Sequence, residues 1–247
     1  MFTLVLKNRH FRGFYCFLRY LYFTRIKKNY NILEIGKTLD EKFVNQKDID
    51  FSSFKQFSQD KYLDTVLKYE ARNQIIKKNF KRTIRNFNGE RIFRLTSNLH
   101  FSKKDYKNLK VLSVGPRNEG EIFSLVTLGV NKKNIKAVDL HSYSPLIDTG
   151  AIETIDFSDI KFDLITVGWV LIYCKDLKLV LKNLVKLSSL NTIISFGSTI
   201  KSVIDERVAN KNIINILNND LNIKFDVIYD NRINLTSELL VIKIKSK

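Results

Sequence analysis

The spacing of apolar residues along the chain changes character close to residue 109. Beyond this point, short runs rich in Val, Leu and Ile alternate with segments in which apolar residues recur every three or four positions. The short runs are typical of strands buried on both faces, whereas the wider spacing is typical of amphipathic helices. Strands are predicted at residues 109–114, 135–139, 162–167 and 192–196, and helices at residues 119–129, 177–187 and 203–217.

The C-terminal end of the chain departs from this alternation. Residues 225–229 and 239–244 both have strand-like composition, and an Asn-rich connection joins them, which predicts a closing hairpin. Strands that alternate with helices form a parallel sheet covered on both faces. The predicted fold of residues 109–247 is therefore α/β, with a doubly wound, mostly parallel sheet that ends in a C-terminal antiparallel hairpin.

Residues 1–108 are predicted to form a basic, mainly helical N-terminal region. Residues 59–86 have apolar positions at helical spacing with Lys and Arg on the opposite face, and Asn88-Gly89 supplies a helix end. Residues 1–110 carry 25 basic and 10 acidic side chains, whereas residues 111–247 carry 17 and 15. Most of the formal net charge of +17 thus belongs to the front of the chain. Such a charge favours nucleic acid, anionic lipid or phosphorylated substrates without distinguishing among them.

Residues 11–23 combine aromatic and basic side chains. Arg19 interrupts their apolar run, which is already shorter than the ~20 residues of a transmembrane helix, and no cleavage site of a secretory signal follows it. This pattern fits either an interfacial membrane helix or a helix that docks on its own domain. In a helix, one face would hold Phe11, Phe14, Leu18, Leu21 and Tyr22.

Several classes of site are excluded by what the sequence lacks. Cys16 and Cys174 lie far apart and outside any CxxC spacing, which argues against a zinc site or a disulfide framework and favours a reducing compartment. No cluster of His, Cys or acidic residues has metal-ligand spacing, so no metal is predicted. The phosphate-binding pattern GxxxxGK[ST] is also absent, which excludes a P-loop nucleoside triphosphatase.

A nucleoside-binding arrangement follows the first predicted strand. Gly115 lets the chain leave this strand sharply, and Gly120 lets the start of the next helix pack closely against a ligand. Asp139 ends the following strand, 24 residues after Gly115. Because ligands bind at the carboxyl edge of such sheets, its carboxylate is placed to accept both hydroxyl hydrogens of a ribose.

From residue 109 to the C-terminus, the sequence resembles the class I S-adenosylmethionine-dependent methyltransferases. Residues 111–115, Val-Leu-Ser-Val-Gly, are similar to the first glycine motif of that family, and residues 138–140, Val-Asp-Leu, to its ribose-binding strand end. Residues 150–163 resemble the adenine-side loop, and residues 168–176 resemble the segment that lies under the methionine moiety. The variant Gly115-Pro116-Arg117-Asn118-Glu119-Gly120-Glu121, with Ser142-Tyr143-Ser144-Pro145 further on, is similar to a bacterial subgroup of these enzymes.

This resemblance implies a Rossmann-like, seven-stranded sheet and S-adenosylmethionine as the cofactor. It assigns Glu119 or Glu121 to the sulfonium and amino group of the cofactor. Two departures from the family pattern are that Pro116 lacks a backbone N–H and that Ala151 replaces an adenine-contacting Asp of many relatives. The resemblance implies no particular catalytic residue, although His141 and Tyr173 follow relevant strands. The implied cofactor-binding residues are Gly115, Pro116, Arg117, Glu119, Gly120, Asp139, Leu140, Ala151, Ile152, Gly168 and Trp169.

The predicted function is methyl transfer from S-adenosylmethionine to a small-molecule, saccharide or lipid-linked acceptor, by in-line displacement at the sulfonium methyl. Residues 1–30 favour peripheral membrane contact, so the predicted location is the cytoplasm, including the inner face of its membrane. Nucleic acid is a less favoured partner, which leaves RNA methylation as one alternative. A noncatalytic binding or scaffold protein on a degenerate methyltransferase fold is the other alternative. The sequence sets no oligomeric state.

Overall fold

The structure is a computed structural model of the 247-residue chain. It describes residues 6–29, 31–32, 90–116, 118–157, 159–171, 174, 176–199, 207–234 and 237–246. The predicted helix at residues 59–86, residues 203–206 of the predicted helix at residues 203–217, and the residues Arg117 and Tyr173 lie outside the described residues. Within the described part of the second of these helices, the α-helix begins at Asn210, three residues later than the first described position, 207.

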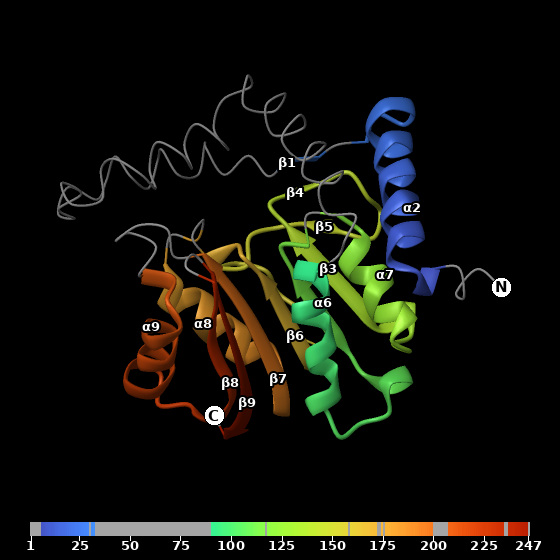
Figure 1. The fold of residues 1–247 in the computed structure, drawn as a ribbon. Helices are drawn as coiled ribbons and strands as arrows, with labels where there is room; N and C mark the ends of the chain where they lie inside the picture. The colour runs from blue at the N-terminus through green and yellow to red at the C-terminus, as the bar shows by residue number, and fades with distance from the viewer. Residues whose placement is uncertain are drawn as a thin grey trace, which may run out of the picture.

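A seven-stranded sheet forms the centre of the molecule (Figure 1). Its strands lie in the order β5-β3-β2-β6-β7-β9-β8. The first five are parallel to one another, whereas β9 runs antiparallel to both β7 and β8. The predicted α/β fold with a mostly parallel sheet and a C-terminal antiparallel hairpin is therefore confirmed. The strands are β2 (Val111–Val114), β3 (Ile135–Asp139), β5 (Asp148–Thr149), β6 (Phe162–Gly168), β7 (Ser188–Thr199), β8 (Lys224–Asn234) and β9 (Ser237–Ser246).

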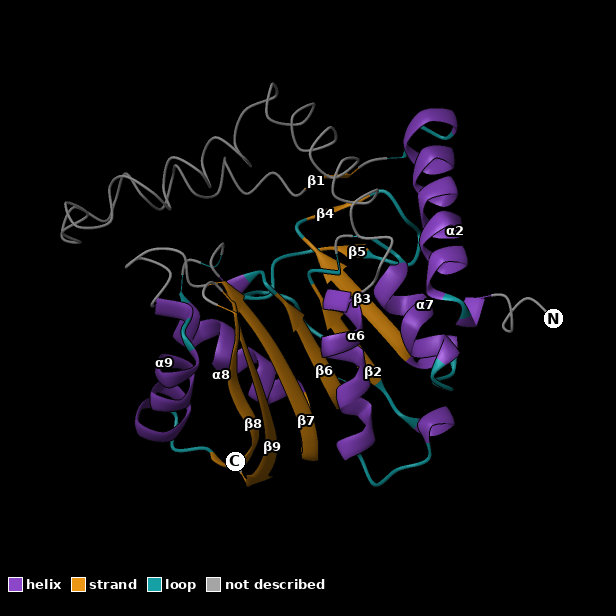
Figure 2. Ribbon diagram, viewed as in Figure 1, coloured by secondary structure: helices purple, strands orange, loops and turns teal. Residues whose placement is uncertain are grey.

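Helices cover both faces of this sheet (Figure 2). On one face, α6 (Glu90–Thr96) and α7 (Gly120–Thr127) bury apolar side chains against Val111, Leu164 and Val241. On the other face, α8 (Leu177–Leu187) and α9 (Asn210–Asn215) pack against a separate cluster of strand residues. The two clusters take alternate residues of the same strands, because successive side chains of a strand point to opposite faces.

Short elements connect these layers. The described residues between β3 and β6 form no helix, and the strands in that interval are β4 (His141–Ser142) and the two-residue β5. The strand β1 (Asn31–Ile32) pairs antiparallel with β4. The remaining short elements are the 3-10 turns η4 (Ser97–Phe101), η5 (Tyr106–Asn108) and η6 (Lys132–Asn134), and the π-helical turns η1 (Tyr22–Ile26) and η9 (Ile216–Asp220).

The N-terminal helix α2 (Arg9–Leu21) packs beside α7 (Figure 1). It begins where the side chain of Asn8 accepts a hydrogen bond from the backbone N–H of His10, which caps the first turn. Cys16 is buried with Leu6 and Phe123, and the Tyr15 ring meets the Phe123 ring edge-on, at 5.3 Å between centroids. No helix in the described part of the chain is long and apolar enough to cross a membrane.

Residues that precede position 109 also complete the core of the sheet. Leu95 of α6 and Leu99 of η4 are fully buried together with Leu125 of α7 and Leu164 of β6. The division of the chain at residue 109 stays a prediction, but α6 and η4 share a hydrophobic core with the elements that follow them. This packing makes residues 90–101 part of the scaffold that holds the carboxyl edge of the sheet.

We expect Leu99→Ala to lower the free energy of unfolding by about 2–5 kcal/mol, because it leaves a cavity in this shared core. Thermal and urea unfolding would measure the change, with Leu190→Ala at an exposed position as the matched control. A Leu99→Ala variant as stable as the control would contradict the inclusion of residues 90–101 in the core.

Candidate active site

The loop after β2 requires glycine at its first position. Gly115 has a φ of +69°, which side chains with a Cβ rarely adopt. A Cβ at Gly115 would also overlap Cγ1 of Val170, from the loop after β6. Its N–H donates to the carbonyl of Val138 at 2.8 Å, which joins the end of β2 to the end of β3. The glycine predicted from the sequence is thus needed both for the turn and for the contact between two loops.

Asp139 lies at the carboxyl end of β3, beside this turn. Its Oδ1 accepts the N–H of Leu140 at 2.7 Å, and Nδ1 of the half-buried His141 lies 3.8 Å from the same oxygen. The backbone carbonyl of Asp139 accepts the N–H of Gly150 at 2.9 Å. Asp139, Leu140 and the residues after Gly150 therefore lie together at one edge of the sheet, next to Gly115.

The segment after β5 forms a turn. The carbonyl of Ala151 accepts the N–H of both Thr154 and Ile155, and the carbonyl of Ile152 accepts Nδ2 of Asn183 from α8. Neither Ala151 nor Ile152 donates its own N–H to another described residue. These two amide groups can therefore serve as donors to a ligand.

Gly168 and Trp169 complete the edge at the end of β6. A Cβ on Gly168 would lie 3.2 Å from the carbonyl oxygen of Gly115, so the two glycines allow their loops to approach closely. Trp169 has a φ of +59°, which is a strained conformation for a large side chain. Its ring packs closely against Gly197 of β7, and the guanidinium of Arg91 lies 3.8 Å from the ring centroid. Trp169 is thus fixed by contacts from β7 and from α6.

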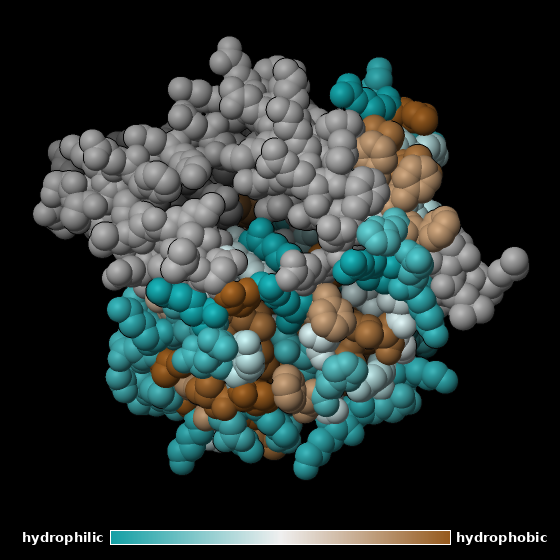
Figure 3. Space-filling view, in the orientation of Figure 1, coloured by the Kyte–Doolittle hydropathy of each residue, from teal (hydrophilic) through white to brown (hydrophobic). Residues whose placement is uncertain are grey.

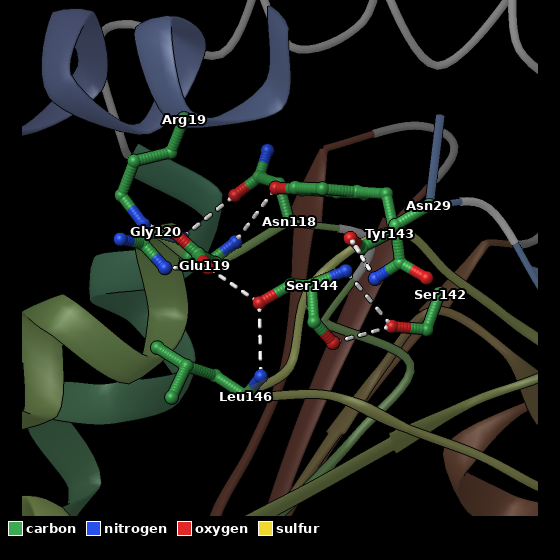
Figure 4. Close-up of polar contacts among 9 residues, drawn as sticks. All are labelled: Arg19, Asn29, Asn118, Glu119, Gly120, Ser142, Tyr143, Ser144 and Leu146. Carbon is green, nitrogen blue, oxygen red and sulfur yellow. Dashed lines mark hydrogen bonds and ion pairs between the residues drawn. The ribbon is translucent and has the colours of Figure 1, made fainter. Parts of the chain in front are cut away.

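Glu119 is fully buried at the start of α7 and is bound by side chains from distant parts of the chain (Figure 4). Arg19 of α2 donates to both carboxylate oxygens, from Nε to Oε2 and from Nη2 to Oε1 at 2.7 Å. The hydroxyl of Ser144 donates to Oε1, and the N–H of Glu119 donates to the Tyr143 hydroxyl at 3.3 Å. Protein donors therefore reach both oxygens of Glu119, and its carboxylate joins α2 to the loop after β2.

Further contacts hold the same junction. The rings of Tyr20 and Tyr143 meet edge-on at 4.8 Å, and Nδ2 of Asn29 donates to the carbonyl of Tyr143 at 3.1 Å. Burial, followed by the charge of Glu119, raises the pKa of Tyr143 well above its usual value, so its hydroxyl keeps its proton. The side chain of Asn118 accepts the N–H of Gly120 at 2.8 Å, and a Cβ on Gly120 would lie 2.9 Å from Cδ1 of Ile92.

A second buried carboxyl, Glu121, lies between α7 and the sheet. Its Oε1 accepts hydrogen bonds from the hydroxyl of Ser113 on β2, at 2.8 Å, and from that of Thr166 on β6. Ser113 and Thr166 are register partners, and Ser195 of β7 continues the row as the partner of Thr166. A buried polar row thus crosses three strands beneath the helices.

Burial raises the pKa of Glu121. The hydrogen bonds from Thr166 and Ser113 and the positive charge of Arg91 oppose this shift, because they stabilise the ionised carboxylate. The cost of removing the charge from water is the largest of these effects, so the folded protein favours the neutral form more than the unfolded chain does.

The sequence predicted the edge residues but missed the side chains that support them. Arg19, Arg91 and Tyr143 are each brought to the site from another element, and no local spacing marks them. The segment Ser142-Tyr143-Ser144 was the one available signal, through its likeness to the bacterial subgroup. Arg117 lies outside the described residues, and no group of His, Cys and acidic residues in the described part of the chain could hold a metal ion.

No known protein family and no curated protein matches the chain in sequence. Among solved structures, one that is similar to this chain is the N-methyltransferase NodS from Bradyrhizobium japonicum WM9 in complex with S-adenosylhomocysteine. The sequence identity is 16%, the match covers 54% of this chain and 76% of that one, and the TM-score is 0.41. Another is a TehB-like S-adenosylmethionine-dependent methyltransferase from Corynebacterium glutamicum, with 16% identity, coverage of 69% and 97%, and a TM-score of 0.48. A third is the Burkholderia thailandensis 1,6-didemethyltoxoflavin-N1-methyltransferase, with 9% identity, coverage of 72% and 91%, and a TM-score of 0.47.

The strand order of the sheet itself decides the fold. Its first five strands follow the doubly wound order 3-2-1-4-5, and the last strand is inserted antiparallel between the fifth and the sixth. This strand order agrees with the seven-stranded sheet that the resemblance to the class I S-adenosylmethionine-dependent methyltransferases implies. In such a sheet the order reverses beside the first strand, here β2, so the candidate site lies at the switch point where ligands bind.

We expect Arg19→Ala to lower the free energy of unfolding, because it leaves a buried carboxylate without its charged partner. Breaking a buried ion pair costs about 3–5 kcal/mol, and we expect a value near the lower end of this range. Urea unfolding would measure the loss. The double variant Arg19→Ala/Glu119→Gln should recover part of it, and Arg25→Ala, at an exposed position of η1, should cost little. A double variant less stable than Arg19→Ala would show that the pair is not what stabilises this junction.

The stability contributed by Glu121 should depend on pH. A carboxyl whose pKa is raised by folding stabilises the protein below the pKa of the unfolded chain, and this stabilisation is lost as the pH rises through the folded-state pKa. Gln does not titrate, so the melting temperature of Glu121→Gln minus that of the wild type should increase between pH 4.5 and pH 8. Asp226→Asn, the same kind of substitution at the exposed carboxyl on β8 that pairs with Lys245, is the control. A difference that stays constant or falls would indicate that Glu121 is ionised in the folded protein.

Proposed function

We propose that the protein transfers the methyl group of S-adenosylmethionine to a small-molecule, saccharide or lipid-linked acceptor. The observation that carries this proposal is the position of the Asp139 carboxylate at the carboxyl end of β3, beside the left-handed turn at Gly115. This is the place at which doubly wound sheets bind the ribose of a nucleoside ligand.

The residues at this edge fit the parts of an adenosyl cofactor. Asp139 is assigned to the ribose hydroxyls, since a carboxylate accepts two hydrogen bonds. The amide groups of Ala151 and Ile152, which donate to no described residue, are assigned to the edge of the adenine ring, with Leu140 beside it. The carbonyl of Gly168 is assigned to the amino group of the methionine moiety, and Trp169 to a wall of the site.

The two buried carboxyls are assigned different tasks. Arg19 and Ser144 donate to both oxygens of Glu119, which suits an anchor for the loop. Glu121 is held by neutral hydroxyl donors on Oε1, and a cation bound nearby would favour its ionised form. We therefore assign electrostatic stabilisation of a bound cation to Glu121.

The cofactor supplies an activated methyl group on its sulfonium, and the protein supplies position. Correct alignment of two reacting groups can account for roughly 7–11 kcal/mol of a barrier. Here the contacts that fix the loops are those between Gly115 and Val170 and those that hold Trp169 between Gly197 and Arg91. These contacts fix the loops after β2 and β6 against their neighbours, and an in-line displacement needs a site that holds the acceptor atom, the methyl carbon and the sulfur in one line.

Titration with S-adenosylmethionine tests the proposal. Trp169 is the one tryptophan of the chain, so its fluorescence reports on the end of β6, and calorimetry measures the affinity independently. We expect saturable binding in the wild type. Asp139→Ala should weaken it by about tenfold or more, because a charge-assisted hydrogen bond contributes roughly 1.5–3 kcal/mol.

Asp226→Asn, which changes a carboxylate remote from this edge, is the control and should bind as the wild type does. Absence of binding, or binding unaffected by Asp139→Ala, would overturn the cofactor assignment. Tight binding without methyl transfer to any acceptor tested would favour the noncatalytic alternative over the enzyme.

A further inference from the structure

The outward face of α2 and η1 carries a continuous stripe of apolar side chains. Their exposed fractions are 59% for Phe11, 51% for Phe14, 46% for Leu18, 42% for Tyr22 and 71% for Ile26. These residues, named here the aromatic stripe, recur at intervals of three or four positions, so they share one side of the helix. Figure 3 shows apolar side chains gathered over α2. Leu21, which the sequence placed on this face, is instead half-buried.

The opposite face of α2 already packs on the protein. Cys16 and Tyr20 are buried, and Arg19 is bound to Glu119. Arg12 donates to the carbonyl of Leu6 at 2.9 Å and to the hydroxyl of Thr127 at 3.4 Å. The helix thus docks on its own domain and also presents an apolar face. The two interpretations of the N-terminal pattern, docking and an exposed interfacial face, apply to opposite sides of the same helix.

Positive charge lies at both ends of the aromatic stripe. Residues 6–29 contain seven Lys and Arg residues and no Asp or Glu. Arg12 and Arg19 point inward, and the other five are exposed near the two ends of the stripe. These five are Lys7, Arg9, Arg25, Lys27 and Lys28.

This positive charge indicates which kind of partner the aromatic stripe can bind. A symmetric contact between two copies would place the same five cations of each protomer against one another, which like-charge repulsion opposes. An anionic bilayer attracts every one of them, and each basic residue near such a surface strengthens binding. Aromatic residues with basic neighbours are also the composition of helices that lie in the plane of a membrane interface.

We propose that α2 and η1 bind an anionic membrane surface through the aromatic stripe, with the helix lying flat in the interface. The stripe extends for about 22 Å at 1.5 Å per residue, which is a length for lying on a bilayer rather than crossing it. The proposal is independent of methyl transfer. If the proposed function also holds, Arg19 on the inward face places the cofactor loop next to the membrane, which suits a lipid-linked acceptor.

Co-sedimentation of the full chain with vesicles, in the absence of S-adenosylmethionine, tests this proposal. Vesicles of phosphatidylcholine and phosphatidylglycerol at 7:3 should bind the wild type, and pure phosphatidylcholine should bind it far less. Phe14→Ser/Leu18→Ser should lower the partition coefficient by at least about tenfold, because two apolar side chains no longer enter the interface. Raising the salt concentration should weaken binding through loss of the electrostatic attraction.

A matched control is Phe101→Ser/Leu190→Ser, which removes one Phe and one Leu of 44% and 63% exposure from elsewhere on the surface. It should bind vesicles as the wild type does. Equal melting temperatures for both double variants would exclude unfolding as the cause of any loss.

Three results would overturn the proposal. One is a wild type that does not sediment with the anionic vesicles, and another is equal loss of binding in the two double variants. The third combines two measurements. In sedimentation velocity without lipid, the wild type self-associates and Phe14→Ser/Leu18→Ser does not, while this double variant still binds vesicles. That result would assign the face to a second copy of the chain. Cofactor titration remains a separate measurement, so failure here leaves the methyl-transfer proposal unaffected.

Discussion

The burial of one carboxylate, Glu119, determines how three separate parts of the chain fold together. A charge without access to water is stable only when paired and hydrogen-bonded. Its partners come from α2 and from the segment after β4, and its own backbone starts α7. The loop after β2 can therefore take its observed path only when both other segments are in place. The N-terminal helix is for this reason a structural part of the candidate site.

The other buried carboxyl of the same turn, Glu121, is stabilised by different contacts. Glu121 lies two positions along the helix and faces the sheet, where Ser113 and Thr166 donate to it. Among the described residues, the hydrogen bonds from Thr166 and Ser113 and the positive charge of Arg91 lower its pKa, but burial has the larger effect. One carboxyl is held by an ion pair that fixes geometry, and the other has a raised pKa and can respond to a bound cation. A stable loop and a responsive charge thus lie within one helical turn.

The parts of the fold that the sequence predicted well are those with local periodicity. The helix α8 was predicted with its observed bounds, Leu177–Leu187, since its apolar spacing is a local signal. Asp139 was found by its distance from Gly115. The two-residue strand β5 is too short to show any pattern, and the contact of Arg19 with Glu119 joins residues 100 positions apart. The positive φ of Trp169 and the close packing of its ring against Gly197 have no local signal in the sequence.

Composition likewise could not separate the two roles of the basic residues in α2 and its flanks. The inward cations satisfy buried acceptors, whereas the outward ones remain exposed. The two roles are mechanically linked, because successive residues of a helix are about 100° apart. A rotation of α2 that buried Phe14 and Leu18 would move Arg19 away from Glu119 and leave that carboxylate without its partner. The exposure of the aromatic stripe is therefore a consequence of the buried ion pair, and a surface that covers the stripe must come to the helix where it already lies.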